Sequence, residues 1–256
     1  MNVRRTVSGL CILSALFVSA VAAQSASAAG TTAYTCKNTG GGGSFIAGHC
    51  KPSDAGSGNF SHVEIANGTT TEVIISDLNT AGAHTGAVFK DTIAGSSIEL
   101  TASAVSGSGT MSNTLENGEM IASGEGTLTY SGVVEDSLGC TVVGIPGGAG
   151  VIETKTLVAT TKGQGDKIKV SPKVGIVLAE FELRNCPIGP ITTKVVGSVL
   201  AVPDGATVNT VHTTVTSDAT MRTQTLFGPV AGIAGTLTIS GRANSSQSYT
   251  PLSVTT

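Results

Sequence analysis

The chain has few aromatic and few charged residues. It contains no tryptophan, and aromatic residues make up 4% and charged residues 12% of its 256 positions, against about 25% charged residues in average globular proteins. The balance of 14 Lys and Arg against 17 Asp and Glu argues against a nucleic-acid partner, because such binding depends on neutralising phosphates with cations. The shortage of aromatic rings argues against a sugar-binding cleft built on aromatic platforms.

Several motifs of catalysis and metal binding are missing as well. The Gly-x-Ser-x-Gly pentapeptide of α/β-hydrolases is absent, and only four histidines are available as bases. No close Cys or His pair has the spacing of a zinc site, and no Asp-x-Asp-x-Asn-Gly calcium loop occurs. We therefore expect neither a bound metal nor a cofactor.

The first 29 residues have the three regions of a secretory signal peptide. Arg4 and Arg5 precede an apolar run at 10–21, and small residues follow at 26–29. The apolar run is shorter than the roughly 20 residues that span a bilayer, and no comparable run follows residue 29. The sequence predicts a secreted, extracellular protein that has no membrane segment after signal cleavage.

Four cysteines follow the predicted signal peptide, namely Cys36, Cys50, Cys140 and Cys186. An even number in an exported chain predicts disulfide bonds, and four cysteines allow three pairings. We favour Cys36 with Cys50 and Cys140 with Cys186, because the first two lie in one short Gly-rich segment. We expect that segment, 30–57, to form a loop pinned by its disulfide.

The rest of the chain shows the signals of an all-β protein. Turn residues separate β-prone runs at four places, namely 67–68, 117–118, 163–165 and 203–205, and each place predicts a hairpin. Apolar residues alternate with Glu180 and Glu182 over 177–183, which is typical of a strand with one buried face. No window after the signal peptide has a convincing helical stripe.

These signals predict an antiparallel β-sandwich over residues 58–242, followed by a polar tail at 243–256. The Gly-rich stretch 144–150 is the best boundary if the sandwich consists of two stacked β units. The predicted core residues are Ile65, Val73, Ile75, Leu100, Met120, Leu128, Tyr130, Leu157, Val177, Phe181, Leu183, Val196, Leu200, Leu237 and Ile239.

A wider pattern joins several short motifs. These are Tyr34-Thr35-Cys36 with a Gly-rich run ending at Gly48-His49-Cys50, then His62-Val63-Glu64-Ile65, Thr161-Lys162-Gly163-Gln164-Gly165, and Ala179-Glu180-Phe181 before Cys186. Over about residues 34–240 the chain resembles a set of uncharacterised secreted proteins of high-GC Gram-positive bacteria. The resemblance implies export and disulfide bonds, and it implies no activity because the group has none assigned.

Three acidic or basic side chains are the first candidates if the protein is an enzyme. Glu180 and Glu182 project from one face of one predicted strand, about 7 Å apart by strand rise, which is a permissive spacing for a glycosidase pair. His62 is the candidate base. An alternative places His62 and Glu64 in a metal site together with His49 or His84.

Three classes of function compete at this point. The leading hypothesis is a non-enzymatic extracellular protein with a structural, surface-associated or binding role, whose partner is cell-wall polymer or a second copy of the chain. The first alternative is a secreted hydrolase acting on polysaccharide or ester. The second alternative is a carrier of a small apolar ligand, because the chain has few bulky side chains with which to fill a large core.

Overall fold

The computed structural model describes residues 30–47, 50, 55–77, 83–93, 96–165, 167–187, 189–203, 212–216, 232–242 and 250–254. All regular structure in these residues is β, and the pairings between named strands are antiparallel except for one short parallel pair. This confirms the predicted all-β, antiparallel class. Among the described residues, no helix is long and apolar enough to span a membrane.

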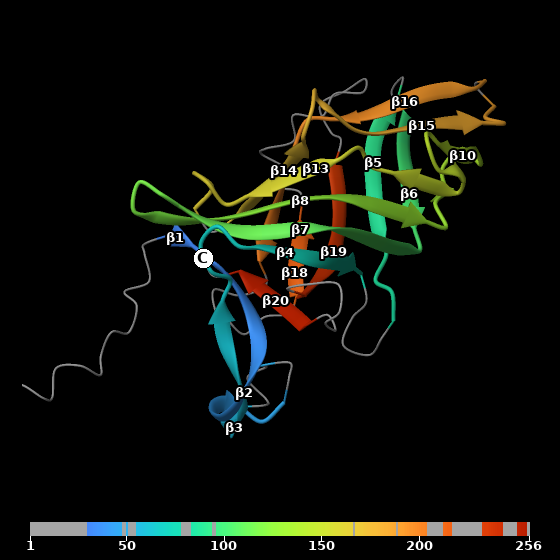
Figure 1. Ribbon diagram of the computed structural model, residues 1–256. Helices are drawn as coiled ribbons and strands as arrows, with labels where there is room; N and C mark the ends of the chain where they lie inside the picture. The colour runs from blue at the N-terminus through green and yellow to red at the C-terminus, as the bar shows by residue number, and fades with distance from the viewer. Residues whose placement is uncertain are drawn as a thin grey trace, which may run out of the picture.

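Eight strands form a closed ring. In ring order they are β4 (Thr70–Ser76), β7 (Ala104–Glu116), β8 (Glu119–Ser131), β13 (Leu157–Thr160), β14 (Ile168–Pro172), β17 (Val199–Pro203), β18 (His212–Thr216) and β19 (Gly232–Arg242). The ring closes because β19 pairs with β18 on one side and with β4 on the other. A closed sheet has no free edge. One of the sheets expected to stack in layers therefore curls back onto itself instead of staying open (Figure 1).

A second, four-stranded sheet packs beside one end of the ring. Its order is β11 (Gly148–Ala149), β10 (Thr141–Gly144), β15 (Val177–Arg184) and β16 (Ile191–Val196). It faces a flap formed by β5 (Ala87–Ile93), β6 (Ser96–Ala102) and β9 (Val134–Glu135), while β12 (Val151–Glu153) pairs with the end of β8. The stretch 144–150 forms the tight β10–β11 hairpin within this sheet.

An arm extends from the other end of the ring (Figure 1). It contains β2 (Ala33–Phe45), β3 (Ala55–Glu64) and β20 (Thr250–Val254), and the short strand β1 (Gly30–Thr31) lies parallel to β8. The Gly-rich segment expected to be a loop therefore contains β1, β2 and the start of β3, and the expected polar tail contains β20. The Cys36–Cys50 disulfide pins this segment as predicted.

Two of the predicted turns that the structure describes connect paired strands. Asn117 and Gly118 both have positive φ, 52° and 86°, and join β7 to β8 as a two-residue hairpin of the expected kind. The turn at 163–165 falls between the paired strands β13 and β14. The strands β17 and β18 also pair, but residues 204 and 205 of the turn predicted at 203–205 lie outside the described residues. The hairpin predicted at 67–68 is wrong, because β3 pairs with β2 whereas β4 pairs with β7 and β19.

Two hydrophobic cores fill the fold. The inter-sheet core lies between the four-stranded sheet, the flap and the adjoining ends of β7 and β8, and includes Phe89, Leu100, Tyr130, Phe181 and Leu183. The ring core lies inside the ring and consists of Ala33, Ile65, Val73, Met111, Ala122, Ile168 and Ala201.

Most of the predicted core residues are buried. Nine are buried and four are half-buried; the half-buried ones are Ile75, Met120, Val177 and Val196. The side chains of Leu237 and Ile239 lie outside the described residues.

Candidate functional site

The interior of the ring contains a cavity of about 110 Å³. Six of the eight ring strands contribute described residues to its lining, which consists of Val73, Ile75, Thr110, Met111, Gly124, Glu125, Gly126, Thr127, Leu128, Leu157, Ala159, Ile168, Val170 and Ala201. The cavity lies beside the ring core, whose residues Val73, Met111, Ile168 and Ala201 it shares.

The cavity exists because the inward positions of β7 and β8 are held by glycine. Gly109 pairs with Gly126, and Gly124 pairs with Met111, so these glycines share the inner face. A Cβ built on Gly109 would lie 2.1 Å from the carbonyl oxygen of Glu125, and one on Gly126 would lie 2.4 Å from that of Ser108. The two strands approach too closely there for any side chain, and the space in front of them stays unfilled.

The surface of the cavity is almost entirely carbon. Thr110 and Thr127 are exposed on the outer face of the ring, and the Glu125 carboxylate accepts a hydrogen bond from Lys173 at 2.6 Å on that face. These three residues therefore border the cavity without placing their polar ends in it. Such a lining attracts apolar molecules by burial and dispersion, and its described residues place no charged group in the cavity.

Asn113 closes one end of the ring interior. Its side chain is fully buried, and its amide nitrogen donates to the carbonyl oxygens of Ala33 (2.9 Å) and Ile65 (2.8 Å). Its amide oxygen accepts a hydrogen bond from the backbone N–H of Ala33 at 2.9 Å. One side chain thus ties the arm to the ring and satisfies three buried backbone groups.

The opposite end of the interior continues into the inter-sheet core. Leu128 borders the cavity, and Val105 and Tyr130 form the next inward-facing pair along β7 and β8. The ring of Tyr130 meets Phe89 edge-on with centroids 4.7 Å apart, and burial raises the pKa of the Tyr130 phenol. This end is filled by large side chains.

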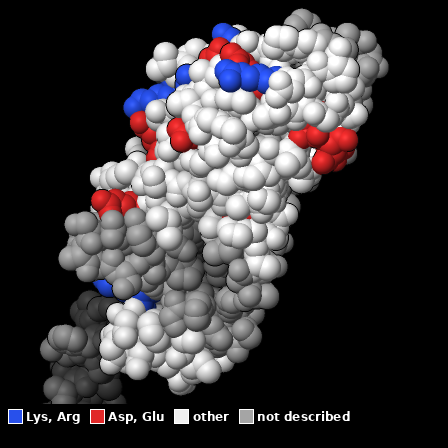
Figure 2. Space-filling view, turned by 90° about the vertical axis from the view of Figure 1, so that its right-hand side faces the viewer, with Lys and Arg blue, Asp and Glu red and all other residues white. Residues whose placement is uncertain are grey.

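Glu180 and Glu182 lie on β15 as half-buried side chains and are paired with cations. Glu180 lies 3.1 Å from the ammonium of Lys194 on the neighbouring strand, and Glu182 accepts from the guanidinium of Arg184 at 2.7 Å. Figure 2 shows charged side chains gathered toward one end of the face it presents, while much of the remainder is uncharged. The two glutamates thus belong to a salt-bridged sheet surface.

His62 lies on β3, in the arm, at the opposite end of the molecule from β15 (Figure 1). Its ring packs against Phe45 with centroids 4.7 Å apart. Burial lowers the pKa of His62, and a hydrogen bond with the backbone of Cys50 opposes this shift in part. The structure does not bring His62 together with Glu180 and Glu182.

The alternative metal site has no counterpart in the part of the chain that the structure describes. No group of three or more His, Cys, Asp or Glu side chains gathers there, and His49 lies outside it. Glu64 lies on β3 near His62, whereas His84 is held elsewhere, by Asp77.

The pair of Asp77 and His84 was not predicted from the sequence. The Asp77 carboxylate is buried and accepts hydrogen bonds from Nδ1 of His84 and from the backbone N–H of Gly86 (2.7 Å). Burial by itself raises the pKa of Asp77, but the hydrogen bonds from His84 and from the backbone at Gly86 and Val105 bring that pKa below its usual value. The pair fastens the connection between β4 and β5.

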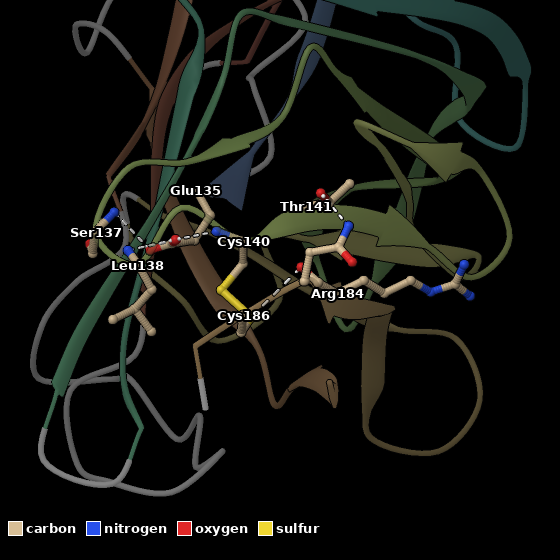
Figure 3. The surroundings of a disulfide bond; sticks show 8 residues. Glu135, Ser137, Leu138, Cys140, Thr141, Arg184 and Cys186 are labelled. Atoms are coloured by element: carbon tan, nitrogen blue, oxygen red, sulfur yellow. Dashed lines mark hydrogen bonds between the residues drawn. A yellow bond between two sulfur atoms is a disulfide. The ribbon is translucent and has the colours of Figure 1, made fainter. Parts of the chain in front are cut away.

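A second buried carboxylate supports the Cys140–Cys186 disulfide (Figure 3). Glu135 accepts hydrogen bonds from the backbone N–H groups of Ser137 (2.8 Å), Leu138 (2.8 Å) and Cys140 (3.2 Å). Burial by itself raises the pKa of Glu135, but the hydrogen bonds have the larger combined effect and bring this pKa below its usual value. The carboxylate holds the turn that presents Cys140 to Cys186, and both predicted disulfide pairings are confirmed.

No protein-family model, curated protein or solved structure matches this chain. The site is therefore interpreted from its own geometry, in which the cavity is the most distinctive feature.

Proposed function

We propose that this is an exported, non-enzymatic binding protein that carries a small apolar molecule inside its ring of strands. The observation that carries the proposal is the cavity of about 110 Å³ with a lining of carbon. Two disulfides support export, since such bonds persist in oxidising compartments. Of the functions that the sequence suggests, this one combines a non-enzymatic binding role with a small apolar ligand.

The energetic cost of the cavity supports a role for it. Unfilled apolar volume destabilises a core because the lining atoms lose van der Waals contacts, and this cavity of about 110 Å³ carries such a cost. A ligand that fills the space recovers the lost contacts.

The placement of the candidate catalytic groups favours binding over hydrolysis. Glu180 and Glu182 are paired with cations on a sheet surface, and His62 lies in the arm. None of the three borders the cavity. The cavity and these three candidate groups lie in separate parts of the fold.

Titration with benzene tests the proposal. We expect the purified protein to bind benzene in calorimetry and to unfold at a higher temperature in its presence, because a ligand that binds only the folded state stabilises it. Ala159→Leu places a larger side chain in the cavity and should abolish both effects. Val158→Leu, which alters the neighbouring outward-facing residue of the same strand, should preserve them.

Two results would contradict the proposal. One is an unfolding temperature that benzene leaves unchanged at saturating concentration in the unaltered protein. The other is a benzene effect that is equally large in Ala159→Leu and Val158→Leu, because binding would then occur outside the ring.

A further inference from the structure

We infer that the ligand is a compact hydrocarbon or similar apolar molecule without a polar head group, held inside the ring of strands. This inference rests on the proposed function and narrows it to a chemical class. It excludes fatty acids and other lipids whose head group must reach water or a polar anchor.

The lining that the structure describes, from six of the eight ring strands, offers no partner for a polar head group. The backbone groups of β7 and β8 are paired with each other along the full length of the hairpin, and those of β13 are shared between β8 and β14. The side chains that enter the lining from these strands are aliphatic, such as Met111, Leu128 and Leu157. A hydroxyl or carboxylate inside would lose its hydrogen bonds to water without replacement, which is strongly unfavourable.

The end closed by Asn113 cannot anchor a head group either. Both donors of its amide nitrogen are engaged by the carbonyls of Ala33 and Ile65, and its oxygen accepts from Ala33. Beside it, the Thr161 hydroxyl accepts from the N–H of Ala122 at 3.1 Å and donates to the carbonyl oxygen of Ala122 at 3.3 Å. The polar side chains at this end are therefore satisfied by the protein itself.

The other end leaves no passage for a chain. Beyond Leu128, the inward-facing Val105 and Tyr130 are buried in the inter-sheet core together with Phe89 and Ile152. A long acyl chain would have to displace several of these large side chains, which interiors packed at crystal density resist. We therefore expect the ligand to end at these side chains on this side of the cavity.

The volume sets the size of the ligand. At a packing density of about 0.74, a cavity of about 110 Å³ holds a molecule of roughly 80 Å³. That is about the size of benzene or of a short alkane, and an apolar cavity of roughly 150 Å³ in another protein is known to stay dry and to bind benzene or xenon.

A ligand series separates this inference from the proposed function. We would titrate the purified protein with benzene, phenol and dodecanoate, each also against Ala159→Leu and Val158→Leu. We expect benzene to bind, phenol to bind at least about tenfold more weakly because its hydroxyl is buried without a partner, and dodecanoate to show no binding that Ala159→Leu abolishes.

The outcomes have distinct meanings. If dodecanoate binds as tightly as benzene and Ala159→Leu abolishes its binding, the cavity functions but the inference about its ligand is wrong. The inference is also overturned if phenol and benzene bind equally well in the cavity. If none of the three binds in a manner sensitive to Ala159→Leu, the proposed function itself fails.

Discussion

The two hydrophobic cores of this molecule differ in their aromatic and glycine content. The inter-sheet core contains the aromatic residues Phe89, Tyr130 and Phe181 together with several leucines. The ring core contains three alanines and no aromatic residue among its described members, and it lies beside inward-facing glycines and a cavity. The difference follows from curvature, because a ring of eight strands bends tightly and close approach of strands at the bend requires glycine.

The comparison shows how the same strands serve two purposes. β7 and β8 pass through both cores, with glycines at 107, 109, 124 and 126 inside the ring and Val105 and Tyr130 in the inter-sheet core. The part of β7 and β8 in the inter-sheet core is densely packed and stabilises the fold. The part in the ring is less densely packed and borders the cavity. We interpret the inter-sheet core as the part of the fold whose stability offsets the contacts that are missing around the cavity.

A matched pair of substitutions tests this difference most strongly. Ile152, with no exposed surface, lies in the inter-sheet core, whereas Ile168 borders the cavity. We expect Ile152→Ala to lower the free energy of unfolding by about 4 kcal/mol. Ile168→Ala should cost about 2 kcal/mol, because a side chain beside a void has already forfeited part of its contacts. Urea unfolding measures both, and equal losses would contradict the comparison.

Removing the Asn113 amide should have the next largest effect. Asn113→Leu removes the side-chain partner of the Ala33 N–H and of the Ile65 carbonyl, while the Ala33 carbonyl keeps a hydrogen bond from the N–H of Ile65. We expect a loss of about 3 kcal/mol. Asn67→Ala is the matched control, because the Asn67 oxygen accepts a single hydrogen bond, from the N–H of Leu115, at an exposed site. A loss no larger in Asn113→Leu than in the control would show that Asn113 does not hold the closed end.

Glycine at the bend should be required where the strands are closest. A Cβ on Gly126 would lie 2.4 Å from the carbonyl oxygen of Ser108, while one on Gly124 would lie 3.0 Å from that of Thr110. We expect Gly126→Ala to destabilise the protein by about 1–3 kcal/mol and Gly124→Ala to cost clearly less. Thermal unfolding of both variants provides the measurement, and the reverse order would refute the role given to the bend.

Acid should weaken the connections that Asp77 and Glu135 make. Both carboxyls have a pKa below the usual value in the folded protein, since hydrogen bonds outweigh burial. The contribution of these two carboxyls to the free energy of unfolding is complete above their pKa in the unfolded chain. It is lost as the pH falls through their lower pKa in the folded protein. Asp77→Asn should cost about 1–2 kcal/mol at pH 7, and the difference from the unaltered protein should shrink below about pH 4. A difference that does not change with pH would contradict this assignment.

Local features of the fold were predictable from the sequence, and long-range ones were not. The β7–β8 hairpin follows from Asn117-Gly118, because turn chemistry and alternation act over a few residues. The turn at 67–68 is equally local, yet its flanking strands take distant partners. The glycines of β7 and β8 were visible as interruptions, but the cavity also requires Ala159 and Ala201 from other strands, and that convergence depends on ring closure.

The candidate catalytic residues illustrate the same limit. The alternation over 177–183 correctly placed Glu180 and Glu182 on one half-buried face of β15. The Lys194 partner of Glu180 could not be predicted from periodicity, because this contact depends on the register between β15 and β16. The Asp77–His84 pair depends on how the chain folds between β4 and β5.

Diffraction from crystals of the purified protein equilibrated with xenon tests the central claim most directly. Xenon is apolar and occupies dry cavities of this size. The account predicts one xenon site inside the ring, in contact with Met111, Ile168 and Gly126, and loss of that site in Ala159→Leu. Ordered water in the cavity, or an interior that takes up no xenon at saturating pressure, would contradict the claim that the ring is built to hold an apolar molecule.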